Sequence, residues 1–383
     1  MVTRRRFLQY AGAGLLLGGA PMATACRGAG RDDLSPPSQS REPVEGLERD
    51  EMEILYLASL APSGHNLQPW TIKIVGPKHW ILGSGRSLWL PAVDPNNREL
   101  LLSLGAFLEN LVIAARTFGY EAEIEIVAAT PFDGEIADIR LRKDKPVDFP
   151  LDKVRRRRTV RSDFSGQEIR VEDLRYITSH DEEPCLQSKV PSPHAFYFSN
   201  GSRIGKALQE GLIEANRVQA FRDPAQEELA AWIRWSDKDA RRYRNGLTPE
   251  SMEIGGFAGW YVRNFYSRQS VLKRSFREQT IDIVTKQVRT CGGWLVVTSL
   301  DSAIPTLIAY GMAFERLFLK VRDRQIALHP MTQMLEEQES LKNDVAGTLD
   351  LTGEVQWILR MGYVRSYPDP VSLRRPVSWF IRS

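Results

Sequence analysis

The stretch Ala61–Trp70, APSGHNLQPW, lies between two regular patterns and is the starting point for interpreting the chain. Before it, Glu51–Leu60 has the apolar spacing of a short amphipathic helix. After it, Thr71–Val75 (TIKIV) has the composition of a strand. The sequence therefore predicts a helix, a tight turn and a strand in direct succession.

The turn itself is built from residues with special backbone properties. Ser63, Gly64 and Asn66 favour turns and expose backbone N–H groups. Pro62 fixes the entry, and Pro69 prevents a helix from continuing. Such a turn is suited to offering amide donors and an Asn side chain to a flat, polar ligand. The same pattern also fits an ordinary capped turn between a helix and a strand.

The remaining patterns indicate two halves with related parts. The expected elements are long helices at Arg98–Phe118 and Asp301–Val321, a strand hairpin at Glu121–Val127 and Asp138–Arg142, a buried strand at Gly293–Ser299, and a last strand at Gln356–Tyr363. The two long helices share a Gly-x-x-x-Glu-x-Leu pattern, which begins at Gly105 in the first and at Gly311 in the second. A shared pattern at the same place in a strand-then-helix unit favours an internal duplication, so that the chain folds as its own pseudo-dimer.

Three motifs together resemble the nitroreductase superfamily, flavin enzymes whose subunits pair to build FMN sites. A-P-S-x-x-N-x-Q-P-W before a strand is similar to one signature of that family. Arg157-Arg158-Thr159-Val160-Arg161 is similar to a second, Arg-Arg-Ser-x-Arg, with Thr in place of Ser. The third is the C-terminal pair Met361-Gly362-Tyr363 and Arg374-Arg375-Pro376. Because the Arg motif follows the turn motif here, the order resembles the Acg-type branch, in which two units are fused and one composite flavin site survives.

The resemblance implies roles for particular residues. Arg157 is expected at the FMN phosphate, with Thr159 donating a hydroxyl and Arg374 or Arg375 completing the clamp, since guanidinium suits a phosphate. Arg161 is expected near flavin N1 and the C2 carbonyl, where a cation raises the reduction potential. Pro62, Ser63, Gly64 and Asn66 are expected along the isoalloxazine edge. Without the resemblance, Arg155–Arg158 also fits a solvated run of charge.

The first residues predict export. Thr3–Leu8 (TRRRFL) matches the twin-arginine pattern, an apolar Ala11–Ala20 run follows, and Ala23-Thr24-Ala25 is a small-residue cleavage site. Cys26 permits a lipoprotein anchor. Residues 1–25 are therefore interpreted as a signal peptide and 26–50 as a flexible linker. The twin-arginine route carries folded proteins, which suits a chain that takes up a cofactor in the cytoplasm and then lies in the periplasm or another extracytoplasmic space.

Composition indicates a globular protein and argues against nucleic acid as a partner. The chain has 383 residues, of which 42% are hydrophobic and 26% charged, as in a typical globular protein. Its net charge of +3 is too small to predict binding to nucleic acid. The five histidines have no metal-site spacing with one another or with cysteines, so no metal is expected. The aromatic and basic segment at about 225–270 fits either a core-facing helix or an insertion that covers the flavin.

The sequence thus predicts an α+β fold with mixed, mainly antiparallel sheets flanked by helices, in a first half at 51–150 and a second at 151–383. The first functional hypothesis is an exported FMN-dependent oxidoreductase that reduces small electron-poor acceptors such as nitroaromatics or quinones. NAD(P)H is the expected electron donor only in the cytoplasm, so the donor stays open. The alternatives are a flavin-binding or storage protein with little turnover, and a lipid-anchored interaction module without a cofactor. No catalytic residue is assigned.

Overall fold

A computed structural model describes residues 28, 43–162, 164–179 and 194–382. The predicted signal peptide, Cys26 and most of the predicted linker lie outside these residues.

The first half forms a five-stranded sheet with two helices. Its elements are α4 (Arg49–Ala58), β1 (Trp70–Gly76), β2 (His79–Ser84), α5 (Arg98–Thr117), β3 (Tyr120–Ile126) and β4 (Glu135–Lys143). The strand order is β3-β4-β2-β1-β9, and every pair is antiparallel except β1 with β9. The last strand, β9 (Ile381–Arg382), comes from the C-terminus.

The second half repeats this plan. Its sheet contains β5 (His194–Ser199), β6 (Gly293–Ser299), β7 (Ile326–Pro330) and β8 (Glu354–Tyr363), all antiparallel, in the order β5-β6-β8-β7. The helix α14 (Ile304–Val321) joins β6 to β7 as α5 joins β2 to β3. Both halves therefore contain strand, helix, strand, strand in the same spatial order, with one further strand beside the first.

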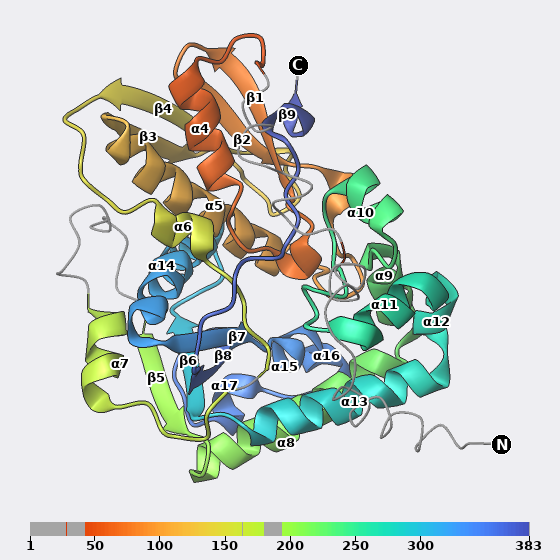
Figure 1. Cartoon of the computed structure of the whole chain (residues 1–383). Coiled ribbons are helices and arrows are strands. Elements are labelled where there is room, and N and C mark those ends of the chain that lie inside the picture. The colour runs from red at the N-terminus through yellow and green to blue at the C-terminus, as the bar shows by residue number, and fades with distance from the viewer. Residues whose placement is uncertain (1–27, 29–42, 163, 180–193, 383) are drawn as a thin grey trace.

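The two long helices lie between the two sheets, as Figure 1 shows. Both are buried on most of their surface because each is covered by its own sheet and by the other helix. Asn110 Nδ2 donates to Glu315 Oε1 at 3.0 Å, and Arg316 Nη1 donates to Glu109 Oε2 at 3.1 Å. Residues 109 and 110 thus meet 316 and 315 in the reciprocal manner of a twofold interface.

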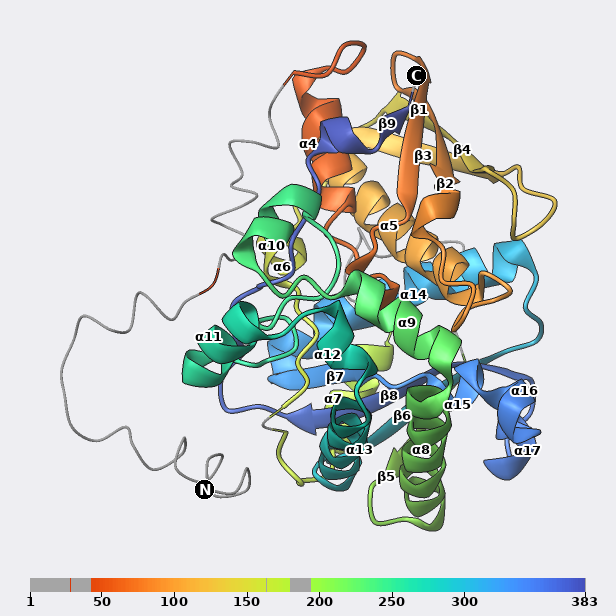
Figure 2. The same ribbon diagram turned by 90° about the vertical axis from the view of Figure 1, so that its right-hand side faces the viewer.

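The C-terminal segment links the halves a second time. After β8 the chain runs from the lower sheet to the upper one and adds β9 beside β1, which Figure 2 shows from the side. Ile72 N donates to Phe380 O at 2.8 Å, and Phe380 is buried against Phe107. The edge of the first sheet is therefore completed by the end of the second half.

The other helices cover the second sheet and the junction. They are α6 (Asp152–Arg156), α7 (Val171–Thr178), α8 (Arg203–Phe221), α9 (Asp223–Trp232), α10 (Asp237–Tyr243), α11 (Gly256–Phe265), α12 (Arg268–Leu272), α13 (Arg274–Arg289), α15 (Gln333–Glu336), α16 (Gln338–Leu341) and α17 (Val345–Thr348). The aromatic segment at 225–270 has a small apolar core of its own around Ile233, Trp235 and Val262. Leu247 from the same segment reaches the cavity described below.

The predicted fold class is confirmed: two mainly antiparallel sheets are flanked by helices. One described helix, α5, is long and apolar enough to cross a membrane, but 83% of its apolar window is buried inside the protein, as expected of a core helix. The predicted start of the second long helix was too early. It begins at Ile304, with Pro305 in its first turn, where the missing N–H is not needed.

Candidate functional site

The turn after α4 contains three non-glycine residues in the left-handed backbone region. They are His65 (φ 47°), Asn66 (φ 55°) and Gln68 (φ 55°). Each such conformation costs on the order of 1–3 kcal/mol and persists where the surroundings hold it. Ser63 Oγ accepts a hydrogen bond from the Gln68 backbone N–H at 3.0 Å, which closes the turn on itself.

Two amide side chains attach this turn to the second half. Asn66 Nδ2 donates to Gly246 O at 3.2 Å and to Leu373 O at 3.1 Å. Gln68 Nε2 donates to Arg244 O at 2.9 Å and also to Leu373 O. The Asn66 amide holds the turn, and Asn66 is not among the residues that line the cavity described below. Its contact with a ring edge stays a prediction.

Arg374 and Arg375 approach the same turn from the outside of the cavity. Arg374 donates to Asn66 Oδ1 at 2.8 Å and to Leu60 O at 2.9 Å. The Arg375 backbone N–H donates to Gln68 Oε1 at 2.8 Å, and its guanidinium donates to Gln68 O. Their guanidinium groups satisfy backbone carbonyls that the unusual turn leaves without helix or sheet partners. The phosphate clamp expected of these two arginines stays a prediction.

Arg157 is likewise a buried structural residue in this structure. Its side chain donates to Leu60 O at 3.0 Å and forms an ion pair with Glu315, with Nε 3.3 Å from Oε1. The guanidinium also lies over the Phe318 ring, 5.1 Å from its centroid. Because Glu315 is fully buried, it requires this cation nearby. Arg157 is not among the residues that line the cavity described below, and its contact with a phosphate stays a prediction.

The other predicted site residues do meet. A cavity of about 250 Å³ is lined by Pro62, Ser63 and Gly64 from the turn and by Thr159 and Arg161 from the Arg motif. These segments are almost a hundred residues apart in the sequence and belong to different halves. Five of the nine predicted residues therefore share one cavity, and the other four fasten the turn that borders it.

Further walls of the cavity come from elements that the sequence did not single out. From α5 they are Glu99, Leu102, Ser103 and Ala106; from the second half they include Gln219, Leu247, Phe314, His329, Gln333, Glu336 and Trp357. Phe314 and Trp357 stack on each other with centroids 4.1 Å apart. The cavity thus has a flat aromatic wall next to polar groups, as small-molecule sites commonly do.

Four buried polar atoms on these walls have no hydrogen-bond partner among the described residues. They are His65 Nδ1, His329 Nδ1, Gln333 Oε1 and Trp357 Nε1. Buried polar atoms are almost always paired, and an unpaired one costs about 1–3 kcal/mol. All four atoms belong to residues that line this cavity.

Arg161 gives one wall of the cavity a positive charge. Its Nη1 donates to Ser251 O at 2.8 Å, and its backbone N–H donates to Glu253 at 2.8 Å, so the segment after α10 fixes its position. Burial, then the nearby Arg161, lowers the pKa of His65 to about 4. Burial, Arg360 and Arg161 lower the pKa of His329 well below its usual value. Both histidines are therefore neutral at neutral pH, and Arg161 carries the charge.

The opposite wall is acidic. Glu99 and Glu336 both line the cavity, and burial raises the pKa of each carboxyl. Sequence patterns gave no reason to select either residue, because Glu99 reads as an ordinary acidic residue in the first turn of a helix. The two carboxyls come together only in the folded chain, where the first turn of α5 and the short helix α15 border the same cavity.

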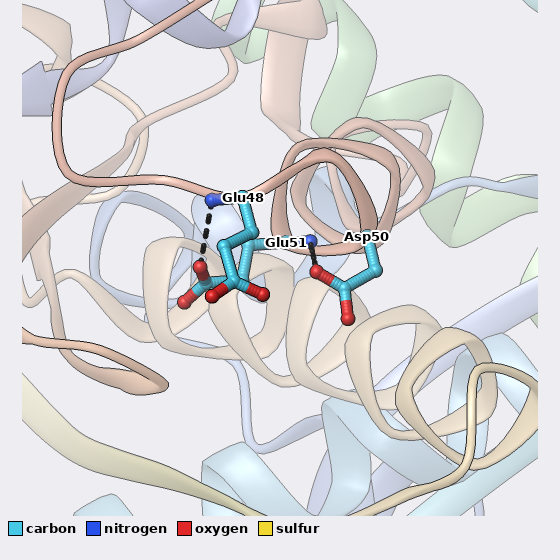
Figure 3. Close-up of side chains that lie close together, drawn as sticks. All are labelled: Glu48, Asp50 and Glu51. Atoms are coloured by element: carbon cyan, nitrogen blue, oxygen red, sulfur yellow. Dashed lines mark hydrogen bonds between the residues drawn. The ribbon is translucent and has the colours of Figure 1, made fainter.

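One group of carboxylates lies away from the cavity and resembles a metal site. Figure 3 shows Glu48, Asp50 and Glu51 around the start of α4. Lys78 Nζ lies 2.9 Å from Glu48 and Asp50 and 3.3 Å from Glu51. The ammonium group already neutralises the cluster, and Glu51 also accepts the backbone N–H of Glu48 at 2.8 Å. We assign no metal to it.

No family model matches the chain. Among curated proteins, an NAD(P)H nitroreductase by name from two strains of Mycobacterium tuberculosis is 39% identical over 71 residues, which is 18% of this chain. That match spans only about a fifth (20%) of those relatives' length. Another relative, from a Serratia species and named "Probable NAD(P)H nitroreductase PigM", is 22% identical over 336 residues, covering 84% of this chain and 90% of the relative.

Solved structures give a weaker comparison. A nitroreductase-like family protein from Bacillus cereus is 12% identical with a TM-score of 0.32, over 62% of this chain and 97% of that one. The FMN-dependent nitroreductase NfnB from Mycobacterium smegmatis is 14% identical with a TM-score of 0.34, over 60% and 96%. Because these scores are low, nothing here is argued from the overlays. This chain is therefore similar to curated proteins that are named nitroreductases.

Proposed function

We propose that this chain is an FMN-dependent oxidoreductase of the nitroreductase type, with its flavin in the cavity between Pro62–Gly64 and Arg161. The observation that carries the proposal is the cavity that brings Pro62, Ser63 and Gly64 of the turn together with Thr159 and Arg161 of the Arg motif. The names of the curated relatives agree with it.

The donor set fits the ring of FMN. The pyrimidine end of an isoalloxazine offers two carbonyl acceptors and one N–H donor. Trp357 Nε1 is a donor, Gln333 Oε1 is an acceptor, and each histidine Nδ1 takes either role according to its tautomer. When bound, FMN supplies two-electron transfer. Arg161 would stabilise negative charge on the reduced ring, and the Phe314–Trp357 stack would exclude water.

The residues expected at the flavin differ in their surroundings. Arg157, Arg374 and Arg375 are buried in protein contacts, whereas Arg161 and Thr159 remain on the cavity wall. We therefore propose that Thr159 and Arg161 are the residues of the Arg motif that contact the flavin directly. The other arginines act through the turn that they position.

We also propose that the chain is a single-chain pseudo-dimer. The equal strand order of the two sheets and the reciprocal contacts of α5 with α14 support an internal duplication. In this arrangement the first half contributes the Pro62–Gly64 turn to the cavity, and the second half contributes the Arg motif. The fusion therefore places both parts of a composite site in one polypeptide.

Electron donor and location are proposed from the relatives' names and the leader. The names of the curated relatives support a nicotinamide electron donor, and small quinones or nitroaromatics are the proposed acceptors.

Export by the twin-arginine route, with Cys26 as a candidate lipid anchor, is proposed from Thr3–Leu8. Replacing Arg4 and Arg5 by Lys should retain the protein in the cytoplasm, and unchanged export would contradict that route.

The test is reconstitution of the purified chain with FMN, followed by removal of free flavin and measurement of the flavin retained. We expect about one FMN per chain in the unaltered protein and a large loss of bound FMN in Arg161→Gln. Arg142→Gln is the control, because Arg142 is exposed near the end of β4 and does not line the cavity. A reduced flavin that is reoxidised by a quinone indicates an enzyme, whereas retained flavin without turnover indicates storage. A chain that retains no flavin would contradict the proposal.

A further inference from the structure

Two carboxyl groups line the cavity together. Glu99 lies in the first turn of α5, and Glu336 ends α15. Thr332 Oγ1 donates to Glu336 Oε1 at 2.7 Å, and Gln219 Nε2 donates to Glu336 Oε2. These donors favour the charged form of Glu336, and burial, followed by that charge, raises the pKa of Glu99.

The surroundings of Glu99 keep a proton on its carboxyl at neutral pH. Burial, followed by the charge of Glu336, raises the pKa of Glu99 to about 7, while Arg98 and Thr332 act in the opposite direction. Arg98 Nη2 lies 3.1 Å from Glu99 Oε1, and Asp94 faces the same group from the loop before α5. Across the cavity, the charged group is Arg161, and the two histidines there are neutral.

Glu99 also lies beside the turn that borders the proposed ring site. Gly64 of this turn and Glu99 both line the cavity, and a Cβ atom built on Gly64 would be 3.8 Å from Glu99 Oε2. A protonated acid in a cavity that also contains a cation is the arrangement expected of a general acid.

We propose that Glu99, held by Glu336, is the acid that gives a proton to the electron acceptor; this rests on the proposed function above. For a quinone, a hydride from the reduced flavin brings two electrons and one proton to the acceptor and leaves an oxyanion on it. The O–H bond of Glu99 then breaks as a new O–H bond forms at that oxyanion. The hydroquinone leaves, and the Glu99 carboxylate takes a proton from water to complete the cycle.

The position of the two residues predicts separate roles. Glu99 contacts the acceptor and is the catalytic residue. Glu336 is a positioning residue, because its other bonds to Thr332 and Gln219 fix its carboxylate where it holds the proton on Glu99. Removing the charge of Glu336 should therefore lower the pKa of Glu99 toward its ordinary value, whereas removing Glu99 should remove the acid altogether.

The experiment uses the FMN-loaded full chain, reduced with dithionite and mixed with a soluble quinone across a pH series. In the unaltered protein, the reoxidation rate should fall above a pH of about 7. Glu99→Gln should lower the rate about 10²–10⁴-fold at neutral pH and remove that pH dependence. Glu336→Gln should move the fall to lower pH. Glu135→Gln, an exposed residue on β4, serves as the control.

Infrared spectroscopy provides a readout that does not depend on turnover. Glu109 and Glu315 also have pKa values raised to about 7, so the Glu99 band is taken as the difference between the unaltered protein and Glu99→Gln. That difference band of a protonated carboxyl should be present below the pKa of Glu99 and disappear as the pH rises through about 7. If Glu99→Gln fails to fold, the pH profile of Glu336→Gln decides the matter.

The possible failures are distinguishable. A chain that binds flavin but whose reoxidation rate and pH profile are the same in Glu99→Gln overturns the proton-transfer role alone. The absence of any difference in the carboxyl band between the unaltered protein and Glu99→Gln does so too. A chain that retains no flavin overturns the proposed function and, with it, this role.

Discussion

Gly105 on α5 and Gly311 on α14 lie against each other at the centre of the molecule, and each occupies the same place relative to the other helix. A Cβ on Gly105 would lie 2.8 Å from Gly311 Cα, and a Cβ on Gly311 would lie 2.9 Å from Gly105 Cα. The same two built atoms would overlap Ile308 O and Leu102 O, which are each three residues before the facing glycine. The repeated sequence pattern is therefore the point at which the two halves make their closest backbone approach.

Gly105→Ala tests this contact. The added methyl group has backbone atoms as neighbours, which cannot move aside as a flexible side chain can. We expect the free energy of unfolding to fall by about 1–3 kcal/mol or more, measured by urea denaturation. Gly134→Ala is the matched control, because a Cβ there meets nothing within 4 Å. Equal stabilities for the two variants would contradict the close approach.

Arg157→Ala distinguishes a structural arginine from a phosphate ligand. Loss of the guanidinium leaves the buried Glu315 carboxylate without its ion-pair partner, so we expect a loss of about 3–5 kcal/mol in the flavin-free protein. Adding Glu315→Gln should recover part of that loss, because the uncompensated charge is then gone. The measurement is a double-mutant cycle on the unfolding free energy. A stable flavin-free Arg157→Ala protein with poor FMN retention would restore the phosphate role.

Asn66 tests how the turn is held. Asn66→Ala removes the hydrogen bonds to Gly246 O and Leu373 O. It also leaves an alanine in the left-handed backbone region at φ 55°, where its Cβ atom is unfavourable. Asn66→Gly removes the same bonds but tolerates that backbone. We expect Ala to be less stable than Gly by about 1 kcal/mol. Hydrogen exchange at residues 373–375 should become faster in both variants; unchanged exchange would show that the Asn66 amide does not hold this segment.

The pKa of Glu99 predicts how stability depends on pH. Its folded-state pKa of about 7 is above the ordinary value of 4.5, so between these values the folded chain keeps a proton that the unfolded chain has lost. The free energy of unfolding should therefore fall as pH rises from about 4.5 to about 7, and this contribution should level off above that. In Glu99→Gln the slope should be shallower. A slope that is the same in both proteins would contradict the raised pKa.

Much of the fold could be predicted because local patterns fixed it. The apolar stripe of α5 and the alternation in β3 placed both elements within a residue or two of their observed ends. Four strands were not predicted, β2, β5, β7 and β9, and the last three lie at the edge of a sheet. Of these, β7 has five residues and β9 has two. Short strands at the edge of a sheet have little periodicity of their own, and they are fixed by pairing with neighbours that are distant in the sequence.

The site was predicted in part for a related reason. Motifs identified Pro62–Gly64 and Arg161, which the structure brings to one cavity. They also pointed to Arg157 and Arg374, whose guanidinium groups face protein atoms instead. Which groups an arginine meets depends on the burial of a partner such as Glu315, and burial of a single glutamate on a helix is not visible in the sequence. Glu99 was missed for the same reason.

The most direct test of the central claim is the flavin content of a variant whose cavity is filled. Ser103 lies on the cavity wall, whereas Ala129 is exposed in the loop between β3 and β4. After reconstitution with FMN, the absorbance spectrum should give about one bound flavin per chain for the unaltered protein and for Ala129→Trp, and almost none for folded Ser103→Trp. Flavin retained equally by all three would contradict a site in this cavity.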